Sequence, residues 1–92
     1  MSEPVTRTLT IVTEKGLHAR ASAKLVELVE DFDAEAVVSK DGTAASADSI
    51  MGLLMLVASK GSTVTVTTTG TTAAELADAI EELVADKFGE EA

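Results

Sequence analysis

Residues 5–20 read VTRTLTIVTEKGLHAR, and within this stretch the spacing of the apolar side chains changes from that of a strand to that of a helix. Its first part, Val5–Val12, is rich in residues that favour strands. A turn follows at Glu14–Gly16, and a helical spacing begins at Ala19. The stretch therefore predicts a strand, a tight turn and the start of a helix. The strand face would carry Val5, Leu9 and Ile11, with Arg7 interrupting them.

The segment after this turn predicts a helix and then a hairpin. Apolar residues spaced four, three and four apart form one helical stripe. Strand character returns over Ala34–Lys40. Asp41-Gly42 is a strong signal for a two-residue turn, which should join this strand to a short one over Thr43–Ala47. The helical stripe consists of Ala21, Leu25, Leu28 and Phe32.

The second half of the chain predicts two more helices around one strand. Ser49 can cap a helix that runs from Ile50 to about Ser59. Valines alternate with threonines over Ser62–Thr69, as in a strand with one face in water. Thr72 and Glu75 then fit a capping box at the start of a last helix. We expect that helix to fray after about Phe88, and its apolar stripe is Leu76, Ile80, Leu83 and Val84.

The element order β-α-β-β-α-β-α predicts a single α+β domain over the 92 residues. Helices with narrow apolar stripes and strands with one apolar face favour a two-layer sandwich. The hairpin indicates a largely antiparallel sheet, whose second face should be open to water.

Composition narrows the classes of function. The net charge of −9 makes nucleic acid an improbable partner, because its phosphates need a positive patch on the protein. Cysteine is absent, which excludes disulfides and thiolate metal ligands and fits a reducing compartment. We find no apolar stretch long enough to enter a membrane and no signal peptide pattern. A cytoplasmic protein is therefore expected.

His18, the only histidine of the chain, stands where the helical spacing begins. Gly16 permits a tight turn there. The first amides of a helix, such as those of Ala19 and Ala21, lack internal acceptors and can hold an anion. The positive end of the helix dipole also disfavours a protonated ring, which keeps a nitrogen available as a nucleophile. These features predict a phosphoryl-accepting site, with a capping or surface histidine as the alternative.

Basic side chains gather near this histidine. Arg20 can offer a planar fork of donors to phosphate oxygens, and Lys15 and Lys24 add positive potential. The pattern contains no second histidine and no spacing of acids that predicts a metal site. We therefore expect neither a metal nor a cofactor.

The segment Ile50–Ala58 carries no charge over nine residues. A small two-layer sandwich cannot bury such a helix on all sides, so part of it should face water. Exposed apolar side chains that include flexible methionines suit docking to several partners. The expected docking residues are Leu17, Ile50, Met51, Leu54 and Met55.

Residues 16–20, GLHAR, resemble the active-site motif of HPr, the histidine-containing phosphocarrier family of the sugar phosphotransferase system. Residues 46–52, SADSIMG, resemble that family's regulatory-serine segment. The resemblance implies an open-faced sandwich of four antiparallel strands under three helices. It also implies that His18 accepts a phosphoryl group on Nδ1 from enzyme I and passes it to a histidine of an enzyme IIA domain, while Arg20 stabilises the phosphate. The sequence leaves the oligomeric state open, but a carrier that docks twice in each cycle is best served by a monomer.

Two positions depart from the family pattern. Ala21 stands where the family has proline. Because alanine has a backbone N–H and proline does not, this change adds one amide donor near the site. Asp48 stands where a lysine is common, and it would repel a phosphate on Ser49. Three readings stay open: a phosphoryl carrier, a regulatory module that acts through Ser49, and an unrelated ligand-binding domain. Neither the sugar nor the choice between transport and a dihydroxyacetone kinase branch follows from the sequence.

The acidity also suits a high-salt cytoplasm. We expect the free energy of unfolding to rise with salt concentration, because screening weakens the repulsion among 16 carboxylates. Denaturant titrations over a range of salt concentrations measure this, and full stability at low salt would contradict the interpretation.

Overall fold

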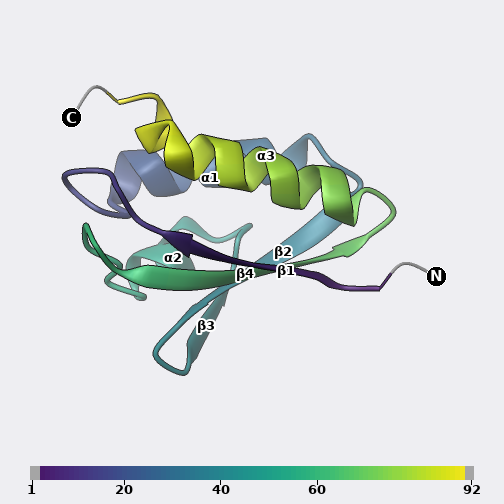
Figure 1. The fold of residues 1–92 in the computed structure, drawn as a ribbon, viewed down its shortest axis with the longest axis horizontal. Coiled ribbons are helices and arrows are strands. Elements are labelled where there is room, and N and C mark those ends of the chain that lie inside the picture. The colour runs from purple at the N-terminus through teal and green to yellow at the C-terminus, as the bar shows by residue number, and fades with distance from the viewer. Residues whose placement is uncertain (1–2, 91–92) are drawn as a thin grey trace.

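The computed structural model describes residues 3–90. Two long helices lie across one face of a twisted sheet, and a short helix lies near one end (Figure 1). This arrangement confirms the predicted α+β sandwich and its element order. The elements are β1 (Val5–Thr10), α1 (Ala19–Glu30), β2 (Ala34–Lys40), β3 (Thr43–Ser46), α2 (Ile50–Leu54), β4 (Thr63–Gly70) and α3 (Ala73–Ala85), followed by a C-terminal turn (Lys87–Gly89).

The four strands form one sheet in the order β1-β4-β2-β3, and every neighbouring pair is antiparallel. Strand β4 lies between β1 and β2, so that Leu9 and Val38 flank its buried valines, Val64 and Val66. Val64, Val66 and Thr68 of β4 are buried on the side of the helices, while the alternate residues Thr63, Thr65 and Thr67 lie on the open face. The predicted alternation of β4 is therefore confirmed.

Both long helices bury one stripe against this sheet. Ala21 and Leu25 of the predicted α1 stripe are buried, but Val29 takes the next buried position, and Leu28 and Phe32 are only half-buried. Arg7, which interrupts the apolar face of β1, forms ion pairs with α3. Its partners there are Asp78 at 2.9 Å and Glu81 at 2.7 Å. The buried residues of α3 are Ala73, Leu76, Ala77, Ile80 and Val84.

The hairpin turn and the Ser49 cap are confirmed. Asp41 and Gly42 both have positive φ, at 50° and 84°, as a two-residue hairpin turn requires. Ser49 Oγ accepts a hydrogen bond of 3.0 Å from the Gly52 amide. The predicted length of α2 is wrong, since the helix ends at Leu54 instead of about Ser59. Val57 has φ 50°, in the left-handed region, so the helix cannot continue through it.

The predicted capping box of α3 is also wrong. Thr72 is the N-cap residue, but its side chain makes no cap hydrogen bond. Its Oγ1 is buried and has no partner among residues 3–90. The Thr72 amide instead donates to the carbonyl of Asp33, just before β2, at 3.2 Å. The position of this helix start is therefore set by a contact between segments.

The chain after α3 is held against the domain. Helix α3 ends at Ala85, three residues before the predicted end near Phe88. Residues 91–92 of the tail that was expected to fray lie outside the described part. Phe88 is fully buried, and its carbonyl accepts a 2.7 Å hydrogen bond from Lys24 Nζ of α1. In the described part of the chain, no helix has the length and apolar character to cross a membrane.

Candidate functional site

Three segments that are far apart in the sequence meet at one end of the molecule. They are the loop from β1 to α1, the loop after α2 and the C-terminal turn (Figure 1). The amide of Leu17 donates to the carbonyl of Ala58 at 2.8 Å, and the amide of Gly61 donates to the carbonyl of Ile11 at 2.7 Å. These two bonds hold the first two segments together and so fix where α1 begins.

Gly16 makes this contact between the loops possible. It has φ 68°, in the region that favours glycine. A Cβ at this position would lie 2.5 Å from the Ala58 carbonyl oxygen and 2.8 Å from the Ser59 Cα. Both obstacles are backbone atoms, so a larger residue would force the loops apart.

His18 is the N-cap residue of α1, as the sequence predicts. Its backbone is extended, with φ −81° and ψ −176°, and its carbonyl accepts the Ser22 amide at 2.8 Å. Its side chain makes no cap hydrogen bond, so the ring is free for other partners. The amides of Ala19, Arg20 and Ala21 belong to the first turn, where amides have no acceptor inside the helix.

The imidazole has a partner that sequence reasoning missed. His18 Nε2 lies 2.8 Å from Oε1 of Glu90, and the two side chains are 23% and 19% exposed. The hydrogen bond from His18 lowers the pKa of the Glu90 carboxyl, and the charges of His18, Arg20 and Lys15 act in the same direction, while burial opposes them. The sequence signal for this contact is Phe88. A large apolar side chain within an acidic tail indicates that the tail packs against the core.

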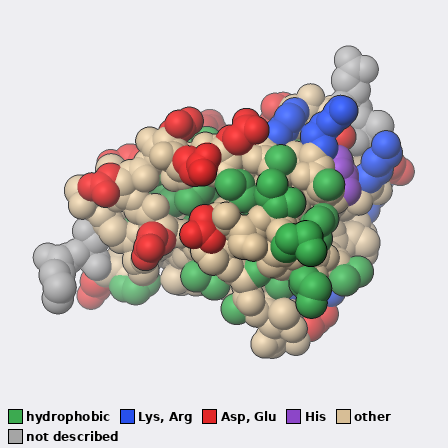
Figure 2. Space-filling model, turned by 180° about the vertical axis from the view of Figure 1, so that it is seen from behind, with side chains coloured by type: hydrophobic (Ala, Val, Ile, Leu, Met, Phe, Trp, Pro, Cys, Tyr) green, Lys and Arg blue, Asp and Glu red, His purple; other side chains and the backbone are tan. Residues whose placement is uncertain are grey.

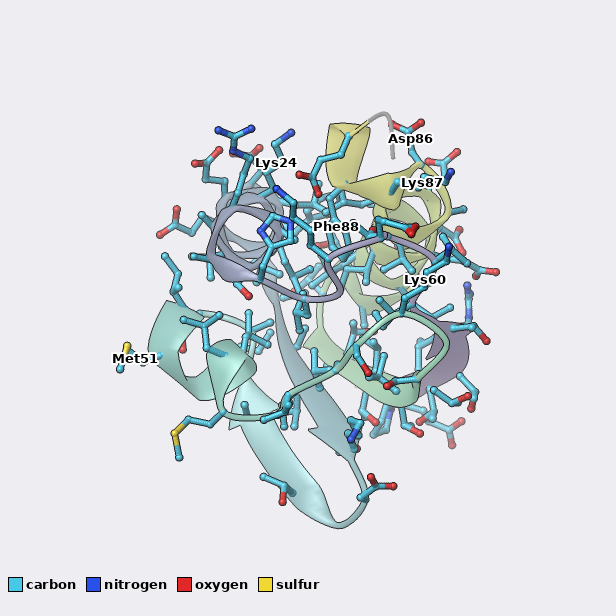
Figure 3. The ribbon with its side chains drawn as sticks, turned by 90° about the vertical axis from the view of Figure 1, so that its left-hand side faces the viewer. Lys24, Met51, Lys60, Asp86, Lys87 and Phe88 are labelled. Atoms are coloured by element: carbon cyan, nitrogen blue, oxygen red, sulfur yellow. The ribbon has the colours of Figure 1, made fainter. Side chains whose placement is uncertain are left out.

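The predicted basic residues lie near the ring but differ in role. Arg20 and Lys15 are exposed, and basic side chains gather beside the histidine while acids are spread over the rest of the same face (Figure 2). Lys24 Nζ instead bonds the Phe88 carbonyl, and both residues lie by the C-terminal turn (Figure 3). Lys24 therefore supports this turn directly. In residues 3–90, no three acidic or histidine side chains are grouped to hold a metal ion.

Most of the predicted docking residues are exposed next to this site. Met51 and Met55 are 71% and 72% exposed, and Met51 points away from the body of the protein (Figure 3). Ile50 is exposed and Leu54 is half-buried. Apolar side chains form a patch beside the histidine in Figure 2. Leu17 is buried in the core, so its expected docking role is not compatible with this structure.

The family model for the PTS HPr component phosphorylation site matches residues 5–86. The chain belongs to the HPr family. The phosphocarrier protein HPr of Cupriavidus necator is 48% identical over 84 residues, which cover 91% of this chain and 94% of that protein. The phosphocarrier protein NPr of Shewanella violacea is 45% identical over 84 residues, 91% of this chain and 92% of that one. The crystal structure of HPr from Thermoanaerobacter tengcongensis superposes with a TM-score of 0.90 at 35% identity, covering 96% of this chain and 99% of that one.

In this HPr-like fold, Ser49 has a structural task. It is half-buried, and its Oγ is already the acceptor of the α2 cap bond. The exposed carboxylate of Asp48 precedes it directly. A phosphate on Ser49 would have to displace or share this cap and would stand beside a like charge.

Replacing Gly16 by alanine tests the contact between the loops. We expect Gly16→Ala to lower the free energy of unfolding by about 3 kcal/mol, because it adds a clash with backbone to the cost of positive φ. Gly42→Ala is the matched control: its φ is also positive, but its Cβ would meet nothing within 4 Å. It should cost only about 1 kcal/mol. Equal losses in urea titrations of both variants would contradict the contact.

Proposed function

We propose that this chain is a phosphoryl carrier of the phosphoenolpyruvate-dependent phosphotransferase system. His18 Nδ1 accepts the group from phosphorylated enzyme I and then passes it to a histidine of an enzyme IIA domain. The chain acts as a stoichiometric monomeric carrier rather than as a catalyst. The observation that carries the proposal is the position of His18 at the N-cap of α1, inside a chain that belongs to the HPr family.

The chemistry needs a nucleophile and compensation for the charge of the phosphate. The Nδ1 lone pair attacks phosphorus while the bond from phosphorus to the donor nitrogen breaks, and the phosphoryl group arrives at the start of α1. The first-turn amides and the positive end of the helix dipole favour an anion there. Arg20 supplies charge-assisted hydrogen bonds to its oxygens. Gly16 keeps the turn tight, and the first-turn amides, which include those of Ala19 and Ala21, have no acceptor inside the helix.

The apolar patch beside the site supplies a docking surface for both partners. We define this docking surface as Ile50, Met51, Leu54 and Met55 of α2 and the turn that follows it. Flexible methionine side chains can adapt to two different partners. The basic side chains of Lys15 and Arg20 adjoin the surface, so an acidic rim on each partner would complement it. Leu17 is left out because it is buried.

The alternative is a regulatory module that acts through Ser49 and docking. In that module the phosphate would go to the Ser49 hydroxyl, which caps α2 in this structure. The module would not explain why His18 lies at the start of a helix. The carrier therefore accounts for more of the site. Relatives named both HPr and NPr support a carrier without indicating which enzyme IIA domain receives the group.

The carrier function predicts a phosphate with the stability of phosphohistidine. Incubation with phosphoenolpyruvate and enzyme I should give an acid-labile, base-stable phosphate that is absent from His18→Ala. Arg20→Ala should slow its formation about tenfold or more, because a charge-assisted hydrogen bond to the phosphate is lost. An acid-stable phosphate on Ser49, with no modification of His18, would favour the regulatory module instead.

The docking surface predicts an effect of Met51→Glu on transfer but not on folding. The substitution places a charge at the centre of an apolar contact, so the rate of transfer from enzyme I should fall about tenfold or more. Stability should change by less than ~0.5 kcal/mol, because the side chain is exposed. Val37→Glu, at an exposed valine on the open face of the sheet, is the control and should leave the rate unchanged. An unaltered rate in Met51→Glu would exclude this surface.

A further inference from the structure

We infer that Glu90 is a positioning residue that selects Nδ1, rather than Nε2, as the nitrogen of His18 that takes the phosphoryl group. The inference rests on the proposed function, and it assigns to the C-terminal turn a task in the chemistry of the site. It is carried by the 2.8 Å contact between Nε2 and Oε1 of Glu90.

The direction of this hydrogen bond determines which nitrogen is nucleophilic. An ionised carboxylate can only accept, so Nε2 must carry the proton and donate it. A neutral imidazole has one N–H, which leaves the lone pair on Nδ1. A glutamate carboxyl is ionised near neutral pH, and the hydrogen bond from His18 lowers the pKa of Glu90 further. The carboxylate also covers Nε2, so the bond both orients the ring and blocks the competing nitrogen.

The backbone of the C-terminal turn holds Glu90 in place. Lys87, Phe88 and Gly89 have φ values of 56°, 56° and 78°, so three successive residues adopt the left-handed region. Two of them are not glycine, and such residues cost about 1–2 kcal/mol each. Burial of the Phe88 ring and the bond from Lys24 Nζ to the Phe88 carbonyl offset this cost. The Glu90 amide bonds the Lys87 carbonyl at 2.9 Å and closes the turn.

The same contact accommodates the change of charge on the ring. When Nδ1 bonds phosphorus, the ring keeps its Nε2 proton and becomes a cation. When the group leaves, the electron pair of the P–N bond returns to Nδ1, and no proton has to move. The Glu90 carboxylate stabilises the cationic ring, whereas Arg20 and Lys15, whose charges also act on Glu90, would oppose it with like charge.

Non-enzymatic phosphorylation tests the assignment without any protein partner. Phosphoramidate transfers its phosphoryl group to an imidazole nitrogen and releases ammonia. We expect the folded protein to be modified on Nδ1, as read by ³¹P and ¹⁵N NMR. Glu90→Ala should give products on both nitrogens and react at Nδ1 about tenfold more slowly, the effect of losing one charge-assisted hydrogen bond.

Two further variants separate geometry from charge. Glu90→Gln keeps an oxygen acceptor for Nε2–H, so it should retain the preference for Nδ1 and lose only rate. Glu35→Gln removes one carboxylate from the exposed face of β2 and should behave as the wild type. In the unmodified protein, ¹⁵N shifts should show the neutral ring protonated on Nε2, and Glu90→Ala should lose part of that preference.

Several results would overturn the inference. One is the same product ratio in the wild type and Glu90→Ala, and another is a wild-type ring whose neutral form is protonated on Nδ1. Failure of the carrier proposal looks different. In that case enzyme I would not phosphorylate His18. Phosphoramidate would still modify only Nδ1 in the wild type, and it would modify both nitrogens in Glu90→Ala.

Discussion

The hydrogen bond from the Leu17 amide to the Ala58 carbonyl is the contact on which the rest of the site depends. It requires two backbones to approach so closely that Gly16, beside it, has no room for a Cβ. The bond fixes the start of α1 and therefore the position of His18. It equally fixes the segment that follows α2. The close approach of these two backbone segments thus sets the distance between His18 and the proposed docking surface.

Backbone strain is concentrated around this contact. Val57 has φ 50° on one side of the site, and Lys87 and Phe88 have φ 56° on the other. Each such residue costs about 1–2 kcal/mol, a considerable part of the stability of a small domain. They persist because their neighbours are fixed: Ala58 follows Val57 and is bonded to Leu17, and Phe88 is buried. Strain of this kind gathers at functional sites, where a side chain must be held in a position that relaxed backbone would not give it.

The features that sequence analysis predicted correctly are those determined by neighbouring residues. Asp41-Gly42 specifies its own turn, and the change of apolar spacing at His18 specifies a helix start. The errors arose where distant segments decide the outcome. The Thr72 amide bonds the Asp33 carbonyl instead of taking part in a capping box. Val57, three residues after the end of α2, adopts a positive φ that a β-branched residue disfavours. Glu90 stands 72 residues from His18, so no local pattern could reveal their contact.

The proposed carrier would have to release the phosphoryl group as readily as it accepts it. The exposure of the site to water is consistent with that requirement. A phosphate held in a closed pocket of fixed donors would be stabilised too strongly to leave. In the proposed carrier the donors would be the first-turn amides of α1, which begins with the exposed Ala19, and the exposed Arg20, where water and salt weaken each attraction. The segregation of charge adds to this effect, because a molecule of net charge −9 keeps only a small basic area around the ring. In the proposed carrier, attraction for the phosphoryl group would therefore be local, and it would be strongest when a docked partner excludes water from the site.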